Sequence, residues 1–495
     1  MNDLLFDNPI LVKHLRSRLR RPQITYLLLV VLVVCGFVMW AGFAGMGFEL
    51  GVPFVLFFLV QGCALHLVGT SQVASSIGQV NDSGILDFHR ISPLPPTTTA
   101  LGFVLGAPIR EYLVAFVALP FALCSALLGK PGIMGFLTTT LVLLTTTWLF
   151  HLLAMTAGLL APRGKTRGTN MGLGFLVVVA FFSSSWVQFG LPIPGMLTAG
   201  PALFEALADP QWMLGRANWP TFFGIAMPLW TQTLCYQLPL IVFLAIPVVR
   251  RMRSSEAALY SKGTAVMFLV VISVLNIGGI VGHKNIQAGW IIPSLLYLNA
   301  TFAMLLIGAI TPEQGAFLNH LRGANKLRLT RPSLWADESS NRSAVIALCG
   351  VTYAMVQSVH SLAFAAAGGQ GPLDYLTPTG IALATIAYVG FAAQYLRIRM
   401  GKKGKGALFV TLFFLWIMPL MAAAVCSLSL GPDVARMVVS VSPFYGIAAG
   451  SIASLILSCL LAILYYGLLV REETRAWVKV KDAAMLKDIE LAPVV

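Results

Sequence analysis

The side chains that could carry out chemistry inside this chain are few and stand apart from one another. His66, His151 and His360 each lie alone in an apolar run, and neither an HExxH nor a GxSxG motif is present. Zinc and serine hydrolases depend on such spacings, because ligands or nucleophile must share one helix face or one sharp turn. A lone histidine in an apolar helix more often bonds a neighbouring helix than relays protons. The sequence therefore predicts no catalytic centre.

Nucleotide and metal sites are not expected either. The closest match to a phosphate-binding loop is Gly164-Lys165-Thr166, but such a loop needs a glycine where Leu159 stands. The 7 cysteines fall in apolar runs without CxxC spacing, which favours buried thiols over metal ligands. We therefore expect no metal ion and no cofactor in this chain, and we do not expect it to be an enzyme by itself.

The segment from residue 81 to residue 96 places charged side chains between two apolar runs. Three apolar residues, Ile85, Leu86 and Phe88, predict a short helix, which Pro93 and the prolines after it would end. The charged side chains of this segment are Asp82, Asp87 and Arg90. We expect these three to face the aqueous phase.

The composition predicts that membrane-spanning helices flank this segment. Hydrophobic residues make up 57% of the 495 residues and charged residues only 11%, whereas a soluble domain carries about 25% charged residues. A bilayer core of about 30 Å needs about 20 mostly apolar residues per helical crossing, and about twelve such runs occur. The sequence therefore predicts an all-α membrane protein of about twelve transmembrane helices. The runs are 24–46, 50–72, 100–128, 134–161, 171–191, 228–249, 264–282, 289–311, 343–367, 376–397, 406–429 and 447–470.

The distribution of basic residues predicts the orientation. The formal net charge of +14 could suit a nucleic-acid partner, but Lys and Arg follow the predicted membrane topology instead. With the N-terminus inside, the outward segments contain only Lys130, Arg216, Lys284 and Arg436. We therefore expect a multi-pass protein of the inner cell membrane with both termini in the cytoplasm, and no nucleic-acid partner.

The runs form two parallel six-helix halves with the same order of loops. The halves cover residues 24–249 and 264–470, and a cytoplasmic connector at 250–263 joins them. Because each half begins inside, the axis of a repeat would lie along the membrane normal. Residues 1–23 are expected to include a basic amphipathic helix at the lipid interface, and residues 471–495 form a cytoplasmic tail.

Two local patterns concern helix packing. In the N-terminal segment, Leu11, Leu15 and Leu19 recur at helical spacing opposite basic side chains. In the third run, Gly102 and Gly106 are four residues apart, which is either a close helix contact or a chance spacing among 45 glycines.

The segment between the second and third runs resembles the corresponding loop in permease subunits of type-2 ABC exporters. That family shows a charged start, a glycine, a Leu-rich helix, a Ser-Pro-Leu sequence and a Gly-containing third helix; the matching residues are Asp82, Gly84, Leu86, Ser92-Pro93-Leu94 and Gly102. The chain departs from the pattern at Asn81-Asp82, where an acidic-basic pair is common. Its Asn8-Pro9-Ile10-Leu11 segment is similar to the family's connecting helix, and a degenerate second loop runs from Thr311 to Trp335.

The resemblance implies a permease subunit in which two six-helix halves are fused. A separate cytoplasmic P-loop ATPase, which holds ATP and Mg²⁺, would dock on the first loop; the docking residues would be Asp82, Gly84, Leu86, Asp87, Arg90 and Pro93. A weaker second docking loop would contain Arg322, Arg328 and Trp335. The sparse charge within the helices favours an amphiphilic or lipidic substrate, exported from the cytoplasm, with membrane lipids as the other partners.

Three other functions stay open. An ion-coupled secondary transporter would keep carboxylates at mid-membrane, but Glu111 and Asp374 lie near helix ends. A membrane enzyme for lipid-linked substrates would need carboxylates or histidines clustered near one surface. A membrane scaffold without transport activity would need no motif at all.

Overall fold

The computed structural model describes residues 8–46, 51–161, 195–208, 221–255, 257–280, 288–329, 333–367, 373–429 and 431–490. These residues are almost entirely helical, apart from the antiparallel pair of β1 (Thr221–Phe222) and β2 (Ile225–Ala226). Among them, 10 helices are long and apolar enough to cross a membrane. The chain is therefore an all-α membrane protein, as its composition predicts.

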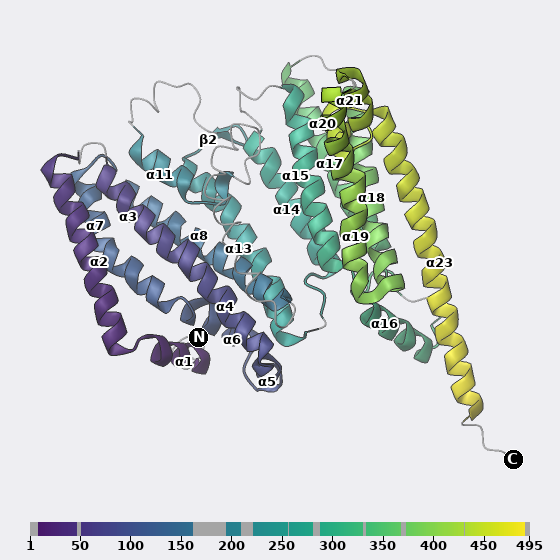
Figure 1. Cartoon of the computed structure of the whole chain (residues 1–495), viewed down its shortest axis with the longest axis horizontal. Helices are drawn as coiled ribbons and strands as arrows, with labels where there is room; N and C mark the ends of the chain where they lie inside the picture. Colours follow the sequence, from purple (N-terminus) through teal and green to yellow (C-terminus); the bar gives the residue numbers. More distant parts are fainter. Residues whose placement is uncertain are drawn as a thin grey trace. The chain divides into compact units, whose positions relative to one another are not determined.

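The chain divides into two compact units, which are described separately. Unit 1 comprises Met1–Ala257 and Gly278–Lys284, and unit 2 comprises Ala258–Ile277 and Asn285–Val495. The helices from the first part of unit 1 are α1 (Pro9–Arg18), α2 (Arg21–Ala41), η2 (Gly42–Met46), α3 (Val52–Gly62), η4 (Cys63–Gly69), α4 (Thr70–Asp82), α5 (Ile85–Ile91), α6 (Pro96–Gly106), α7 (Ile109–Leu128), α8 (Gly132–Leu160), α11 (Gly200–Leu207) and α13 (Leu229–Arg253) (Figure 1). The remaining helices are α14 (Lys262–Ile280), α15 (Ala288–Ile310), α16 (Gln314–Lys326), α17 (Arg342–Ala367), α18 (Leu373–Met400), η6 (Gly401–Lys403), α19 (Gly404–Leu412), η7 (Phe413–Ile417), α20 (Met418–Ser429), α21 (Pro432–Val439), α22 (Pro443–Ala449) and α23 (Ile452–Glu490).

The helix that contains the second predicted run continues beyond that run. α3, η4 and α4 form one continuous helix from Val52 to Asp82, whereas the predicted run covers residues 50–72. Val73 and Ile77 are fully buried in a cluster with apolar residues of α8. Gly158 of α8 makes room for them, because a Cβ there would overlap the Ile77 side chain. Burial of this apolar face keeps α4 helical despite its polar residues.

The third predicted run, 100–128, consists of two helices rather than one. α6 ends at Gly106 and α7 begins at Ile109, with Ala107 and Pro108 between them. Proline has no backbone N–H, and its ring clashes with the preceding turn. The prediction of a single helix is therefore wrong, and α7 alone is long enough to qualify as a span.

The total of twelve helices stays a prediction. The candidate span Tyr375–Ser427 is 53 residues long and includes two predicted runs, 376–397 and 406–429. Between them Gly401 adopts a left-handed φ of 56° in a short 3-10 turn, which separates α18 from α19. The run predicted at 171–191 lies outside the described residues.

α1 packs closely against α6 (Figure 1). A Cβ atom at Gly102 would lie 2.8 Å from Ile10 Cβ, and one at Gly106 would lie 2.9 Å from His14 Cβ. These distances leave no room for a larger residue at either position. The spacing of the two glycines is therefore a close helix contact, one of the two readings of the sequence.

The buried side of α1 differs from the predicted leucine stripe. Ile10 and His14 are only 4% and 9% exposed, whereas Leu11 and Leu15 are half-buried. Asn8 fixes the start of the helix, because its Oδ1 accepts a hydrogen bond from the Ile10 backbone N–H (3.1 Å). One side of α1 thus packs against α6, which the alternation of leucine and basic residues does not reveal.

Substitution of Gly106 by valine is expected to destabilise unit 1 by about 1–3 kcal/mol, because the added side chain must displace His14. The measurement is thermal unfolding of the purified protein in mild detergent. Gly36→Val is the matched control, since nothing lies within 4 Å of a Cβ at this exposed position of α2. Equal melting temperatures for the two variants would contradict the close contact.

Candidate functional site: the α4–α6 loop and the second loop

The predicted short helix between the second and third runs is present as α5. α4 ends at Asp82, whose side chain is exposed, and Gly84 precedes α5 with a left-handed φ of 75°. Glycine adopts this conformation without a steric penalty, which explains why it stands between two helices that change direction here. At the other end, Pro93 is exposed and Pro96 occupies the first position of α6, where its missing N–H costs nothing.

Leu86 anchors α5 to the interior of unit 1. Its side chain is 1% exposed and belongs to the cluster that contains Ile77 of α4, Phe103 of α6 and Met252 of α13. One apolar side chain thus joins α5 to three longer helices. Movement of α5 must therefore displace these helices or break the contact.

Arg90 connects the same short helix to the end of α13 by a hydrogen bond. Its Nη1 donates to Asp87 Oδ1 at 2.5 Å and its Nη2 donates to the Arg251 carbonyl at 3.1 Å. The carbonyl belongs to the last turn of α13, where cationic groups stabilise unpaired carbonyls and the helix dipole. The Arg90 side chain is only 12% exposed, whereas that of Asp87 is 53% exposed. The prediction that Arg90 faces water is therefore wrong, and the structure makes it a positioning residue.

Two histidines connect α5 and α1 to α6 through one aromatic ring. Phe103 makes edge contacts with His14, at 5.5 Å between centroids, and with His89, at 6.2 Å. Burial, followed by the charge of Lys13, lowers the pKa of His89. Neutral imidazoles suit this packing, since an aromatic edge contact with a buried charge would need further partners.

The exposed face of α5 is apolar. Ile85, Phe88 and Ile91 are 42%, 66% and 83% exposed and recur every three residues, so they lie along one side of the helix. Exposed apolar side chains grouped in this way indicate a contact surface. The charged residues of this segment gave no sign of this apolar face, although its three-residue spacing is visible in the sequence.

Acidification is expected to weaken the packing of α1 on α6. Burial, followed by the nearby charges of Arg18 and Lys13, lowers the pKa of His14 from 6.5 to about 4. The unfolded chain then binds more protons between these two values, so the stability from neutral His14 is complete above pH 6.5 and declines as the pH falls toward 4. Melting temperatures at about pH 7.5 and about pH 5 should differ less in His14→Gln than in wild type. An equal decrease in both proteins would assign the pH dependence to other groups.

In unit 2, the weaker docking candidates lie in and after α16. α16 buries Phe317 and Leu321, whereas Arg322 is exposed and donates to Asn319 of the same helix (3.3 Å). The other two candidates, Arg328 and Trp335, are also exposed, and the backbone of Arg328 has a left-handed φ of 51°. All three side chains are therefore exposed, one on α16 and two in the segment between α16 and α17. Their docking role stays a prediction.

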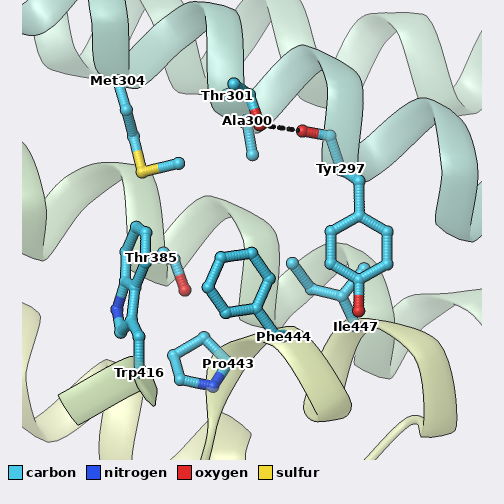
Figure 2. A pocket seen from close by; sticks show the side chains of 9 residues that line it. All are labelled: Tyr297, Ala300, Thr301, Met304, Thr385, Trp416, Pro443, Phe444 and Ile447. Atoms are coloured by element: carbon cyan, nitrogen blue, oxygen red, sulfur yellow. Dashed lines mark hydrogen bonds between the residues drawn. The ribbon is translucent and has the colours of Figure 1, made fainter. Parts of the chain in front are cut away.

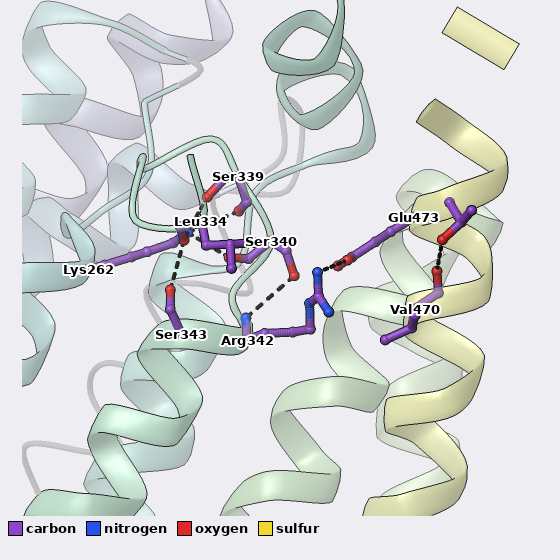
Figure 3. Close-up of polar contacts among 9 residues, drawn as sticks. Lys262, Leu334, Ser339, Ser340, Arg342, Ser343, Val470 and Glu473 are labelled. Atoms are coloured by element: carbon purple, nitrogen blue, oxygen red, sulfur yellow. Dashed lines mark hydrogen bonds and ion pairs between the residues drawn. The ribbon is translucent and has the colours of Figure 1, made fainter. Parts of the chain in front are cut away.

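A buried lysine fixes the part of this loop that precedes α17 (Figure 3). Lys262, at the start of α14, is 1% exposed. Its Nζ donates to the Leu334 carbonyl (2.8 Å), the Ser339 hydroxyl (2.6 Å) and the Ser340 carbonyl (2.6 Å). The Ser339 carbonyl is a fourth, longer acceptor at 3.3 Å, so every N–H group of the ammonium has an acceptor. No pattern in the sequence distinguishes Lys262 from the other basic residues of the 250–263 connector.

An ion pair joins the same region to the long α23. Arg342 Nη2 lies 2.7 Å from Glu473 Oε2, and both side chains are largely buried (Figure 3). Exposed Arg399 and Arg475 pair with the adjacent Glu472 at 3.3 Å and 2.8 Å. α23 is therefore held by ion pairs to the first turn of α17 and the last turn of α18.

The membrane histidines of unit 1 are hydrogen-bonded, as expected for structural residues. His151 Nε2 donates to the Leu65 carbonyl at 3.1 Å, so its Nδ1 accepts from the Tyr112 hydroxyl at 3.1 Å. His66 Nε2 donates to the Leu143 carbonyl at 3.3 Å. Both imidazoles bond neighbouring helices, and the structure gives no reason to assign them to proton transfer.

The search for a metal site covers the part of the chain that the structure describes. No group of three or more His, Cys, Asp or Glu side chains there could hold a metal ion. The Gly164-Lys165-Thr166 sequence lies outside the described residues. No family model matches this chain, and no curated protein or solved structure shows significant similarity to it.

Proposed function

We propose that this chain is the transmembrane permease subunit of an ATP-binding-cassette exporter, with two six-helix halves in one polypeptide. A separate cytoplasmic P-loop ATPase would hold ATP and Mg²⁺ and dock on the α4–α6 loop. The two halves would move an amphiphilic or lipidic substrate out of the cytoplasm. The chain would lie in the inner cell membrane with twelve transmembrane helices and both termini inside.

The observation that carries the proposal is that α5 has an exposed apolar face and, on its other side, buried contacts that attach it to longer helices. Ile85, Phe88 and Ile91 are available to a partner, while Leu86 and Arg90 attach the helix to α4, α6 and α13. A force applied to the exposed face would therefore reach three long helices. A subunit that closes on ATP binding needs such a connection to change the membrane helices.

The distribution of charge supports a cytoplasmic position for this loop. α13 ends with Arg250, Arg251 and Arg253, and Arg90 bonds that end directly. α1, which carries basic residues in its last turn, packs on the neighbouring α6. Clusters of Lys and Arg mark the cytoplasmic side of membrane proteins.

Co-purification tests the proposal. The tagged chain should bring down a P-loop ATPase from membranes solubilised in mild detergent. Asp87→Lys should weaken this association, because Asp87 is the most accessible charged side chain of α5. The substitution would also remove the carboxylate that pairs with Arg90. Asp433→Lys is the matched control, since that carboxylate is 93% exposed in α21. A complex-preserving preparation without any ATPase would reject the exporter assignment in favour of a self-sufficient carrier or a scaffold.

A further inference from the structure

Unit 2 contains a small cavity between α15, α18, η7 and α22 (Figure 2). Its volume of about 20 Å³ is close to that of one water-sized sphere. Three of its nine lining residues are aromatic, and two of these, Tyr297 and Phe444, stand at a partly exposed rim. No charged residue lines it.

The aromatic walls are held in fixed positions. Trp416 lies in the π-helical turn η7, and its indole N–H donates to the Tyr388 hydroxyl. Ser442, before α22, donates to the Trp416 carbonyl at 3.1 Å. Phe444 meets Trp416 edge-on at 5.1 Å between centroids and stacks on Tyr297 at 6.1 Å. The cavity is therefore preformed, and π-helical turns of this kind are frequent at functional sites.

One polar atom in this wall lacks a partner. Thr385 is 2% exposed, and its Oγ1 makes no hydrogen bond within the described structure. Thr379, six residues earlier in α18, bonds the Tyr375 carbonyl at 2.6 Å in the usual way for a helical threonine. An unpaired hydroxyl buried in a membrane helix is costly and favours a ligand that can bond it.

Water is a poor occupant of this cavity. A buried water needs two to four polar partners, and Thr385 offers one. The other hydroxyls nearby each make a hydrogen bond within the protein: the Thr301 hydroxyl donates to the Tyr297 carbonyl at 2.7 Å, and the Tyr297 hydroxyl bonds the backbone of Ala448. The indole of Trp416 is likewise bonded. A group that brings one hydrogen bond and an apolar remainder fits better.

We propose that this cavity binds the hydroxyl or carbonyl end of an uncharged, lipid-like molecule. The polar end bonds Thr385, the adjacent methylene groups contact Trp416 and Phe444, and the chain leaves over Tyr297. The absence of charged lining residues excludes ionised head groups, because they would enter without a counter-charge. This binding site stands independently of the proposed export function.

The test is photo-crosslinking of the purified full chain in lipid nanodiscs. The probe is a long-chain alcohol that carries a diazirine beside the hydroxyl end, and the matching diazirine alkane without the hydroxyl is the reference. Mass spectrometry should locate the alcohol label on peptides containing Trp416 or Phe444, and excess unlabelled alcohol should compete with it. Thr385→Val should reduce labelling by roughly three- to tenfold, the loss of one hydrogen bond. Thr385→Ser should retain it.

Thr379→Val is the matched control, because it removes a bonded hydroxyl from the same helix. It should leave labelling at the wild-type level. Thr385→Val should melt no lower than wild type, since it deletes an unpaired group without changing the volume. Equal labelling by alcohol and alkane, unchanged labelling in Thr385→Val, or a label spread evenly over lipid-facing helices would each overturn the proposal.

Discussion

The double substitution Phe88→Glu with Ile91→Glu is expected to abolish association with the partner ATPase, reducing its affinity by about 100-fold or more. Two exposed apolar side chains would be replaced by carboxylates that a desolvated interface cannot accommodate. The fold should persist, because both side chains point away from the cluster that holds Leu86. Quantitative pull-down of the ATPase by the tagged chain measures the effect.

The conservative pair Phe88→Leu with Ile91→Val is the matched control, since it keeps the face apolar at similar volume. It should retain most of the bound ATPase. Retention of the ATPase by the glutamate variant would mean that α5 is not the docking helix. Loss in both variants, with normal melting temperatures, would show that shape matters as much as polarity at this face.

Arg90 is expected to behave differently from the exposed face. Its side chain is 12% exposed and connects Asp87 with the carbonyl of Arg251. A docking residue contributes to the affinity for the ATPase, whereas Arg90 would transmit a force applied to α5 to the end of α13. The structure therefore separates the predicted docking residues into an exposed set with Asp82 and Asp87 and a buried set with Leu86 and Arg90.

The sequence predicts the membrane character and the short α5 well because each depends on local composition. Long apolar runs are sufficient to identify most spans, and a glycine followed by apolar residues and then prolines is sufficient to place α5. The differences occur where packing overrides composition. α4 stays helical to Asp82 because Val73 and Ile77 fit beside Gly158, and the break at Pro108 interrupts a run that hydropathy alone reads as continuous.

The contacts that position the candidate site could not be predicted from one sequence. The bond from Arg90 reaches a carbonyl 161 residues away, and Lys262 bonds groups 72 to 78 residues away. Neither contact has a local pattern, because a backbone carbonyl carries no residue identity. The exposed face of α5 differs from these contacts. The three-residue spacing of its apolar residues is visible in the sequence, and only their exposure to solvent could not be predicted.

Substitution of Lys262 by methionine is expected to destabilise unit 2 by about 3–5 kcal/mol. Methionine fills a similar volume but leaves the buried carbonyls of Ser339 and Ser340 without the ammonium donor. The loop before α17 should then become susceptible to protease while the helices of unit 1 keep their stability, because the hydrogen bonds that Lys262 makes to this loop lie within unit 2. Limited proteolysis with mass spectrometry, together with thermal unfolding, measures both effects.

Lys402→Met is the matched control, since Lys402 is exposed in the turn after α18 and its removal should change stability by less than about 0.5 kcal/mol. A wild-type protease pattern for Lys262→Met would show that the serine-rich loop is ordered without the ammonium group. The expected pattern would instead make Lys262 the residue that fixes the second loop, in the way that Leu86 and Arg90 fix α5. Each unit would then hold its exposed loop with buried contacts to its own helices. In unit 1 these contacts are the packing of Leu86 and the two hydrogen bonds of Arg90, and in unit 2 they are the hydrogen bonds of the buried Lys262 ammonium.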